Sequence, residues 1–126
     1  MSQLTAKERH STAADVTQVE HVDFKPQLRP GELLTGTPTV TVVAGSGEVT
    51  VSNEQLNTSQ LELRGVDAPR TALPGEVAQF QAAYAAAVTV AQFVFKVECD
   101  TIKAGVDPYR HLVGWIVVPV ETAPTA

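Results

Sequence analysis

The chain has 126 residues, of which 44% are hydrophobic and 18% are charged, and this balance excludes a chain that is disordered throughout. The length suits one domain, large enough to bury a core without disulfides or a structural metal. The formal net charge of -5 and the scattered positions of the 9 basic residues argue against a protein that binds the phosphate backbone of nucleic acids.

Membrane, export and disulfide signals are missing from the sequence. No stretch approaches the roughly 18–20 consecutive apolar residues that cross a bilayer, and the N-terminal sequence MSQLTAKERHSTAADVTQ has no apolar segment typical of an export signal. Cys99 is the only cysteine, so no intramolecular disulfide can form, and we expect it to be a small core residue. We therefore predict a protein that is made and kept in water, without a membrane partner.

The two ends of the chain lack the patterns of folded elements. Residues 1–17 are polar, mixed in charge and without hydrophobic periodicity, so they cannot offset the entropy cost of ordering and are predicted to be a flexible N-terminal arm. This arm is either a frayed terminus or a segment that becomes ordered when it lies along a neighbouring subunit. Residues 121–126 (ETAPTA) are predicted to be a disordered C-terminal tail, which leaves residues 18–120 as the β-sandwich domain.

Strand signals begin directly after the arm. Residues 18–24 predict a first strand, and residues 37–44 predict a second one in which apolar and polar side chains alternate. The glycines of residues 45–47 (GSG) supply the positive φ of a tight turn, and residues 48–52 resume the alternation, so a β-hairpin is predicted here. Residues 60–64 (QLELR) predict another short strand.

Residues 77–87 (VAQFQAAYAAA) fit two patterns. Val77, Phe80 and Tyr84 have helical spacing, whereas Phe80, Ala82 and Tyr84 share one face of a strand. Because alanine favours a helix, we predict a short helix or an irregular crossover, with a strand as the open alternative.

Residues 88–100 (VTVAQFVFKVECD) show the clearest strand pattern in the chain. One face is apolar, with Ala91, Phe93, Phe95, Val97 and Cys99. The other face is polar apart from Val94, with Gln92, Lys96, Glu98 and Asp100. This alternation predicts a strand with one buried and one solvent-exposed face. Residues 112–120 (LVGWIVVPV) are apolar on both faces, so this last strand is predicted to be interior or covered on its second face by another molecule.

These strands are separated by turns and accompanied by at most one helix. That order predicts an all-β protein, an antiparallel β-sandwich of about seven strands. The alternation of strands and helices that builds a parallel sheet is missing from the sequence.

The histidines offer little catalytic chemistry. His10, His21 and His111 are the candidate bases for a nucleophile, and none lies in a recognisable catalytic motif. His21 and Asp23 share a strand face and could supply two metal ligands, but no third or fourth ligand follows at a characteristic spacing. We therefore interpret them as a polar surface pair and predict no metal and no cofactor.

Glu98 and Asp100 share a strand face, as the paired carboxylates of acid–base catalysis do. Because they lie on the exposed face of an alternating strand, we interpret them as solubilising charges, and no catalytic residue is predicted. Trp115, the only tryptophan, is either a ligand-stacking platform or, in an apolar final strand, a core or interface residue.

Several segments taken together resemble a known family. VDFKPQLRPGELL precedes TPTVTVV, a glycine turn follows, and VAQFVFKVECDT precedes a closing WIVVPV. This order resembles the fiber–tail adaptors, small virion proteins of tailed bacteriophages, over about residues 22–120. Its most specific part is Asp23-Phe24 followed by Pro30-Gly31-Glu32. The chain departs from the family pattern in the alanine-rich residues 77–87 and in a longer turn at residues 101–111.

The resemblance implies an immunoglobulin-like sandwich and a non-enzymatic structural subunit of the neck or tail. Such a subunit would form a symmetric ring of several copies and link fibers to the particle. Its partners would be other virion proteins, namely neck, tail or connector subunits and fibers, with no nucleic acid and no membrane. Its localisation would be the virion, after synthesis in the host cytoplasm.

Three other functions remain open at the level of sequence. A capsid decoration (cement) protein needs the same small sandwich. A carbohydrate-binding module would use Trp115, Tyr84 or Tyr109 as its stacking platform. An enzyme would rest on the polar residues His21, Asp23, Glu98 and Asp100.

Overall fold

The computed structural model of the chain describes residues 5–9, 12–56 and 75–120. These residues form seven strands and one short 3₁₀ turn, and no helix among them could span a membrane. The elements in chain order are β1 (Thr5–Arg9), β2 (Thr17–Asp23), η1 (Lys25–Gln27), β3 (Glu32–Ala44), β4 (Val49–Leu56), β5 (Val77–Tyr84), β6 (Gln92–Lys103) and β7 (His111–Pro119).

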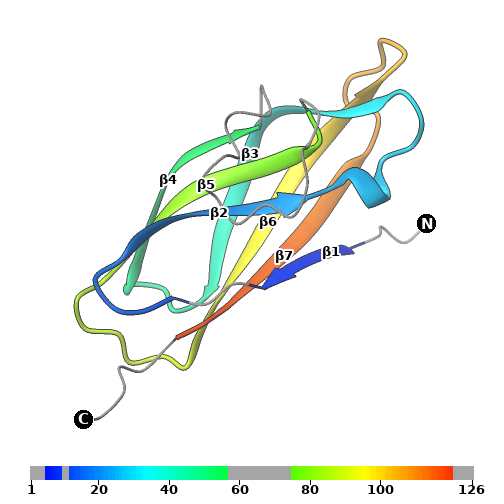
Figure 1. The fold of residues 1–126 in the computed structure, drawn as a ribbon. Helices are drawn as coiled ribbons and strands as arrows, with labels where there is room; N and C mark the ends of the chain where they lie inside the picture. The colour runs from blue at the N-terminus through cyan, green and yellow to red at the C-terminus, as the bar shows by residue number, and fades with distance from the viewer. Residues whose placement is uncertain (1–4, 10–11, 57–74, 121–126) are drawn as a thin grey trace.

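The strands form two sheets that pack face to face (Figure 1). One sheet has four strands in the order β1-β7-β6-β3, and the other has three in the order β2-β5-β4. All neighbouring strands are antiparallel except β1 and β7, which are parallel. With β2, β5 and β4 in one layer and β3, β6 and β7 in the other, the arrangement is that of an immunoglobulin-like sandwich. The predicted fold, a sandwich of about seven strands, is confirmed.

The core lies between the two central strands, β5 and β6. Phe80 of β5 meets Phe95 of β6 edge to face, with ring centroids 5.1 Å apart. Tyr84 of β5 lies 4.8 Å from Phe93 of β6. These contacts join the layers through aromatic pairs, each of which adds to the stabilisation from burial alone.

Cys99 lies on the same inner face of β6 and is buried, as predicted. Burial, and then the nearby Asp100 carboxylate, raises the pKa of the Cys99 thiol to about 12. The thiol is therefore protonated at neutral pH and acts as an apolar packing group.

Gly114 lets the two layers approach closely in the middle of β7. A Cβ atom at this position would lie 2.7 Å from Val22 Cγ1 and 2.8 Å from Phe24 Cζ. Both neighbours are fully buried at the end of β2, so a side chain at position 114 would push the three-stranded sheet away from the four-stranded one.

The predicted hairpin around residues 45–47 is wrong. The chain does turn between β3 and β4, with Gly45 and Gly47 at positive φ, but β3 pairs with β6 and β4 pairs with β5. The turn therefore crosses from one sheet to the other. Its position explains Gly45, where a Cβ atom would lie 2.2 Å from Phe93 Cδ1 in the core.

The helix or crossover predicted at residues 77–87 is also wrong, because Val77–Tyr84 is the central strand of the three-stranded sheet. Its inner residues Ala78, Phe80, Ala82 and Tyr84 are all buried. Burial on this face and pairing on both edges outweigh the helix preference of alanine, and the open alternative of a strand holds.

The N-terminal arm differs from its prediction over Thr5–Arg9. These residues pair with β7 in parallel register, and the Thr12 amide donates a hydrogen bond of 2.9 Å to the Pro119 carbonyl. Main-chain pairing along the free edge of β7 accounts for this strand, although its residues lack an apolar pattern. The strand predicted at residues 60–64 and the tail at residues 121–126 lie outside the described residues.

Candidate interaction surface

The outer side of β6 and β7 carries the only tryptophan of the chain, together with valines and charged side chains. Along β7 every second residue points into the sandwich and is buried, and the residues between them point outward and are partly or fully exposed. We call the outward-pointing set from Val94 to Asp100 on β6 and from His111 to Val117 on β7 the outer face. It comprises Val94, Lys96, Glu98 and Asp100 of β6 and His111, Val113, Trp115 and Val117 of β7.

The antiparallel register arranges the outer face in four rows. Asp100 lies opposite His111, Glu98 opposite Val113, Lys96 opposite Trp115, and Val94 opposite Val117. The face therefore has a charged end and an apolar end, with Trp115 next to the boundary.

Trp115 and the three valines remain partly exposed in the isolated chain. The Lys96 ammonium covers part of the indole, at 6.0 Å from the ring centroid, which is within the range of a cation–π contact. The Lys96 ammonium also lies 3.8 Å from a Glu98 carboxylate oxygen, and the side chains of this loose pair are 36% (Lys96) and 26% (Glu98) exposed. Trp115 is therefore not a core residue, and this position suits both a ligand-stacking platform and an interface residue.

His111 joins the two carboxylates at the charged end. Its Nδ1 lies 2.7 Å from Asp100 Oδ1, and its Nε2 lies 2.9 Å from Glu98 Oε2. These hydrogen bonds, first that with Asp100 and then that with Glu98, raise the pKa of His111 above its usual value. Both ring nitrogens are engaged, so the imidazole as placed here offers no free lone pair to a substrate proton or a metal ion.

The sequence predicts Glu98 and Asp100 as a pair of solubilising charges and does not connect them to His111, a candidate base outside any catalytic motif. The connection follows from the β6–β7 register, which sets Asp100 opposite His111 on the same face. If the last two strands are assumed to pair as antiparallel neighbours, Asp100 and His111 can be predicted to lie opposite each other.

The polar surface pair predicted at His21 and Asp23 is corrected by the structure. His21 points outward from β2, opposite Gln79, yet it is only 3% exposed. Asp23 instead accepts a hydrogen bond of 3.0 Å from the Lys25 amide and so caps the turn that follows. In the part of the chain that the structure describes, no three potential ligands gather around a common metal position.

The polar residues considered for an enzyme lie on different sheets. His21 and Asp23 belong to β2 of the three-stranded sheet, whereas Glu98 and Asp100 belong to β6 of the four-stranded sheet. The structure therefore does not bring these two pairs together. His10 lies outside the described residues.

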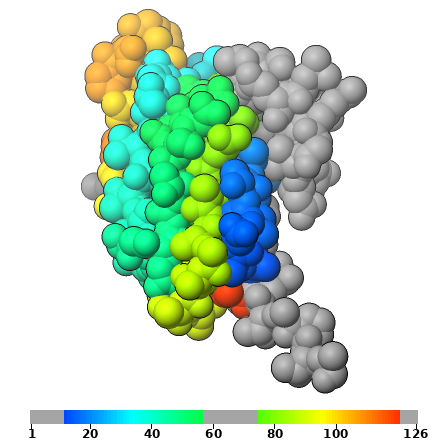
Figure 2. Space-filling view, turned by 90° about the vertical axis from the view of Figure 1, so that its left-hand side faces the viewer, coloured from blue at the N-terminus to red at the C-terminus, as the bar shows by residue number. Residues whose placement is uncertain are grey.

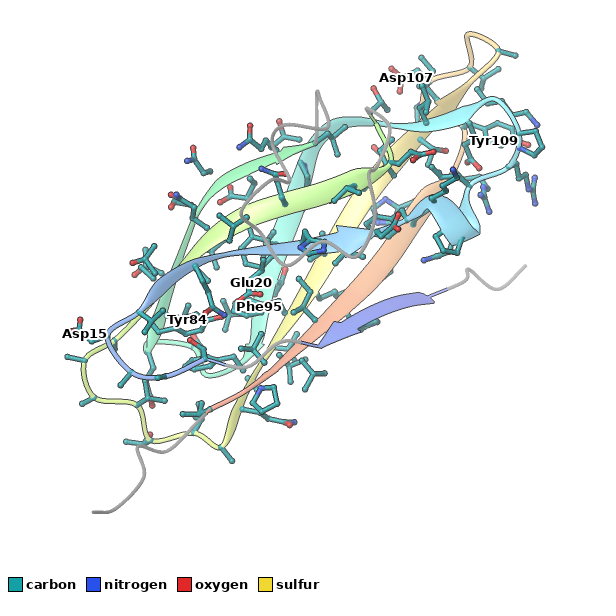
Figure 3. The ribbon with its side chains drawn as sticks, viewed as in Figure 1. Asp15, Glu20, Tyr84, Phe95, Asp107 and Tyr109 are labelled. Atoms are coloured by element: carbon teal, nitrogen blue, oxygen red, sulfur yellow. The ribbon has the colours of Figure 1, made fainter. Side chains whose placement is uncertain are left out.

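The two tyrosines considered as stacking platforms both make contacts within the chain, Tyr84 in the core and Tyr109 at one end of the sandwich (Figure 3). Tyr84 is buried, and its hydroxyl donates a hydrogen bond of 2.8 Å to Glu20, which is also buried. Burial, and then the Glu20 charge, raises the pKa of Tyr84. Tyr109 lies beyond the end of β6, where its hydroxyl accepts a hydrogen bond of 3.0 Å from Arg29. The Lys103 ammonium lies 5.5 Å from the same ring.

A second charged cluster, at the end of the sandwich, was missed by the sequence reasoning. The Glu32 carboxylate is buried at the start of β3 and accepts hydrogen bonds from Arg110 Nε (2.8 Å), Thr101 Oγ1 (2.6 Å) and the Arg29 amide (2.8 Å). Arg110 Nη2 also donates to the Gln27 carbonyl over 2.7 Å. The cluster thus ties η1 to the starts of β3 and β7 and to the end of β6.

Two opposing effects set the pKa of Glu32. Burial alone raises it, but the hydrogen bonds from Arg110, the Arg29 amide and Thr101 outweigh burial and lower it to about 2. Glu32 belongs to the motif that made the family resemblance most specific, and the structure gives this residue a role in the fold.

Figure 2 shows the outer side of the three-stranded sheet, with β4, β5 and β2 side by side. This side differs from the outer face in its residue types. Its outward positions are mostly neutral and polar, with Thr50 and Ser52 on β4 and Gln79 and Gln81 on β5. Asn53 Nδ2 donates a hydrogen bond of 3.3 Å to Gln81 Oε1 across the two strands. An aromatic residue with valines around it occurs on the outer face of the other sheet and not at these positions.

The fold and the outer face define the class of this protein as an immunoglobulin-like β-sandwich with one amphipathic sheet face. Comparisons with models of protein families, with curated proteins and with solved structures gave no match. The function is therefore argued from the surface and from the resemblance described above.

Proposed function

We propose that the chain is a non-enzymatic structural subunit of a bacteriophage virion, an adaptor that links fibers to the neck or tail of the particle. The observation that supports this proposal best is the outer face, where Trp115, Val113 and Val117 point away from the core on a strand of the sheet interior. Apolar side chains grouped on one sheet face favour contact with another protein.

The composition of the outer face matches that of protein interfaces. Aromatic residues are enriched at the centres of interfaces, and charged residues are depleted there but common at the rim. Trp115 with the valines provides such a centre, and Lys96, Glu98 and Asp100 lie beside it. A partner that covers Trp115 would bury an indole that is partly exposed in the isolated chain.

The fold is the one that the family resemblance implies, and this agreement adds support to the adaptor function. Several copies in a symmetric ring would give an avidity that a single contact of about 800 Å² per partner cannot reach. Synthesis in the host cytoplasm suits a chain whose one thiol is buried and protonated.

Cryo-electron microscopy of phage particles from the source tests the proposal. We expect density for a small two-layered β domain at the neck or tail, repeated in a ring and in contact with fibers. Density on the head lattice would replace the adaptor by a capsid decoration protein. The absence of the chain from particles would contradict both virion functions.

The partial exposure of Trp115 also supports a second candidate, a carbohydrate-binding module. In that case glycans would shift the emission of Trp115, and they would protect it from quenching by acrylamide. For the adaptor we expect glycans to leave the emission unchanged. Because Trp115 is the only tryptophan, its fluorescence reports on the outer face alone.

A further inference from the structure

We infer that the outer face binds a second copy of this chain through a two-fold axis at right angles to the strands. The inference rests on the proposed function, because it names one partner of the surface from which that function is argued. Two features support it, namely the division of charge along the face and the position of the apolar residues.

Charge divides the outer face into two halves along β6. Asp100 and Glu98 make one half acidic, with two carboxylates around the single imidazole of His111. Lys96 is the next outward residue and is basic, and Val94 follows it. The change of sign therefore falls between Glu98 and Lys96, near the middle of the face.

In a closed, symmetric dimer, two identical faces that meet are related by a two-fold axis that lies between them. If the axis ran parallel to the strands, each row would lie over the same row of the other copy, and acidic halves would meet. If the axis runs at right angles to the strands, the row order is reversed. When the axis passes between the rows of Glu98 and Lys96, Lys96 of each copy faces Glu98 of the other, and Asp100 lies one row further along. Because like charges that face each other across an interface are unfavourable, charge selects the second arrangement.

The apolar residues suit the same arrangement. Trp115 lies in the row next to the change of sign, so the two-fold axis passes close to it in both copies. Each indole is then covered by the other copy, together with Val113 and Val117. A central tryptophan surrounded by charged pairs is the usual anatomy of an interface with a hot spot.

Two charge-reversal variants, measured first alone and then as a mixture, test the inference. In Lys96→Glu homodimers, acidic groups face each other, and in Glu98→Lys homodimers, basic groups do. We expect each variant alone to associate about tenfold more weakly than wild type, or worse. A mixture of the two variants places opposite charges together at both contacts, and we expect it to form mixed dimers with an affinity close to that of wild type. Sedimentation velocity and native mass spectrometry, with one variant isotope-labelled, measure both effects.

Matched controls place the same charges on the other sheet. Gln81→Glu and Gln81→Lys change an outward residue of β5, and we expect both to associate like wild type. The thermal midpoint of each variant shows that it is folded. If Glu98→Lys does not fold, Asp100→Lys replaces it, because Asp100 lies in the same half with its side chain 51% exposed. The emission maximum of Trp115 in wild type provides an independent reading, and we expect it to shift to the blue as the concentration rises.

A chain that stays monomeric at all concentrations would overturn the inference, as would single variants that associate like wild type or a mixture with no gain in affinity. A monomeric chain that nevertheless occupies the neck of particles would overturn the two-fold pair and leave the adaptor function standing. A dimer with the predicted mixing behaviour that is absent from particles would support the pair and contradict the adaptor function.

Discussion

The two charged clusters of this sandwich use the same kind of carboxylate in opposite ways. Glu32 is buried and accepts hydrogen bonds from three groups, including a two-nitrogen contact with Arg110. Glu98 and Asp100 are partly exposed and hold His111 between them. The difference teaches that the first cluster stabilises the fold, since a buried charge cannot lose its partner cheaply. The second costs little to change and remains accessible to another molecule.

Glu32→Gln tests whether the buried Glu32 cluster stabilises the fold. The amide keeps the shape of the side chain but removes the charge that pairs with Arg110, whose side chain is only 21% exposed. We expect the free energy of unfolding to fall by about 3 kcal/mol, as is typical when a buried ion pair loses one member. Chemical denaturation measures it, and a loss below about 1 kcal/mol would show that the cluster does not secure the fold.

Acid should remove the contribution of Glu32 in a defined range. The pKa is about 2 in the folded chain and 4.5 for an unperturbed group, so the carboxylate stabilises the fold fully above pH 4.5. The contribution is lost as the pH falls through about 2. The difference in stability between wild type and Glu32→Gln should therefore shrink over this range. A difference that stays constant down to pH 2 would contradict the pairing.

Arg110→Lys should have an intermediate effect. Lysine keeps the positive charge but cannot donate at the same time to Glu32 and to the Gln27 carbonyl with the geometry of a guanidinium. We expect a loss of about 1–2 kcal/mol, measured in the same denaturation experiment. If lysine were as stable as arginine here, charge alone would account for the cluster.

His111→Asn should have the smallest effect, below about 1 kcal/mol, because the histidine and its two partners are all partly exposed. The pKa of His111 is raised in the folded chain, so protonated histidine stabilises the fold below its usual pKa of 6.5. This contribution is lost as the pH rises through the higher folded value. Titration of the ring by NMR in wild type and in Glu98→Gln measures it, and an unshifted pKa in wild type would contradict the cluster.

The sequence predicts those parts of the fold that depend on a local pattern. Residues 88–100 alternate with period two, and the structure confirms the strand from Gln92 onward, as β6, with Phe93, Phe95 and Val97 buried. Residues 88–91 precede the strand, and Ala91, predicted on the buried face, is exposed. The period of side chains along a strand is a local property, so it can be read without knowing the neighbours. The class of fold follows from it.

Sheet membership, in contrast, depends on the whole molecule. The glycines at residues 45–47 predict a reversal of the chain correctly, but they do not say which sheet the next strand joins. In Val77–Tyr84 the alanines favour a helix, and only the strands on both edges and the aromatic residues of β6 make a strand the better solution. The strand Thr5–Arg9 depends on main-chain pairing with β7, for which its side chains give no signal.

The candidate site also depends on contacts between residues that are distant in the sequence. Residues 112–120 are apolar on both faces, so the sequence alone does not say whether Trp115 points into the core or outward. Glu32 and Arg110 lie 78 positions apart in the chain, so their contact had no local signal. His111 and Asp100 are 11 positions apart, and a correct pairing of the last two strands would have joined them.

The most direct test of the account is the reactivity of Trp115 toward hydroxyl radicals, measured by mass spectrometry in the diluted chain and in intact particles. We expect Trp115 to react readily in the diluted chain and to be strongly protected in particles. Outward residues of the three-stranded sheet, such as Gln81, should react to the same extent in both states. Equal reactivity of Trp115 in both states would contradict the claim that the outer face is where this protein meets its partners.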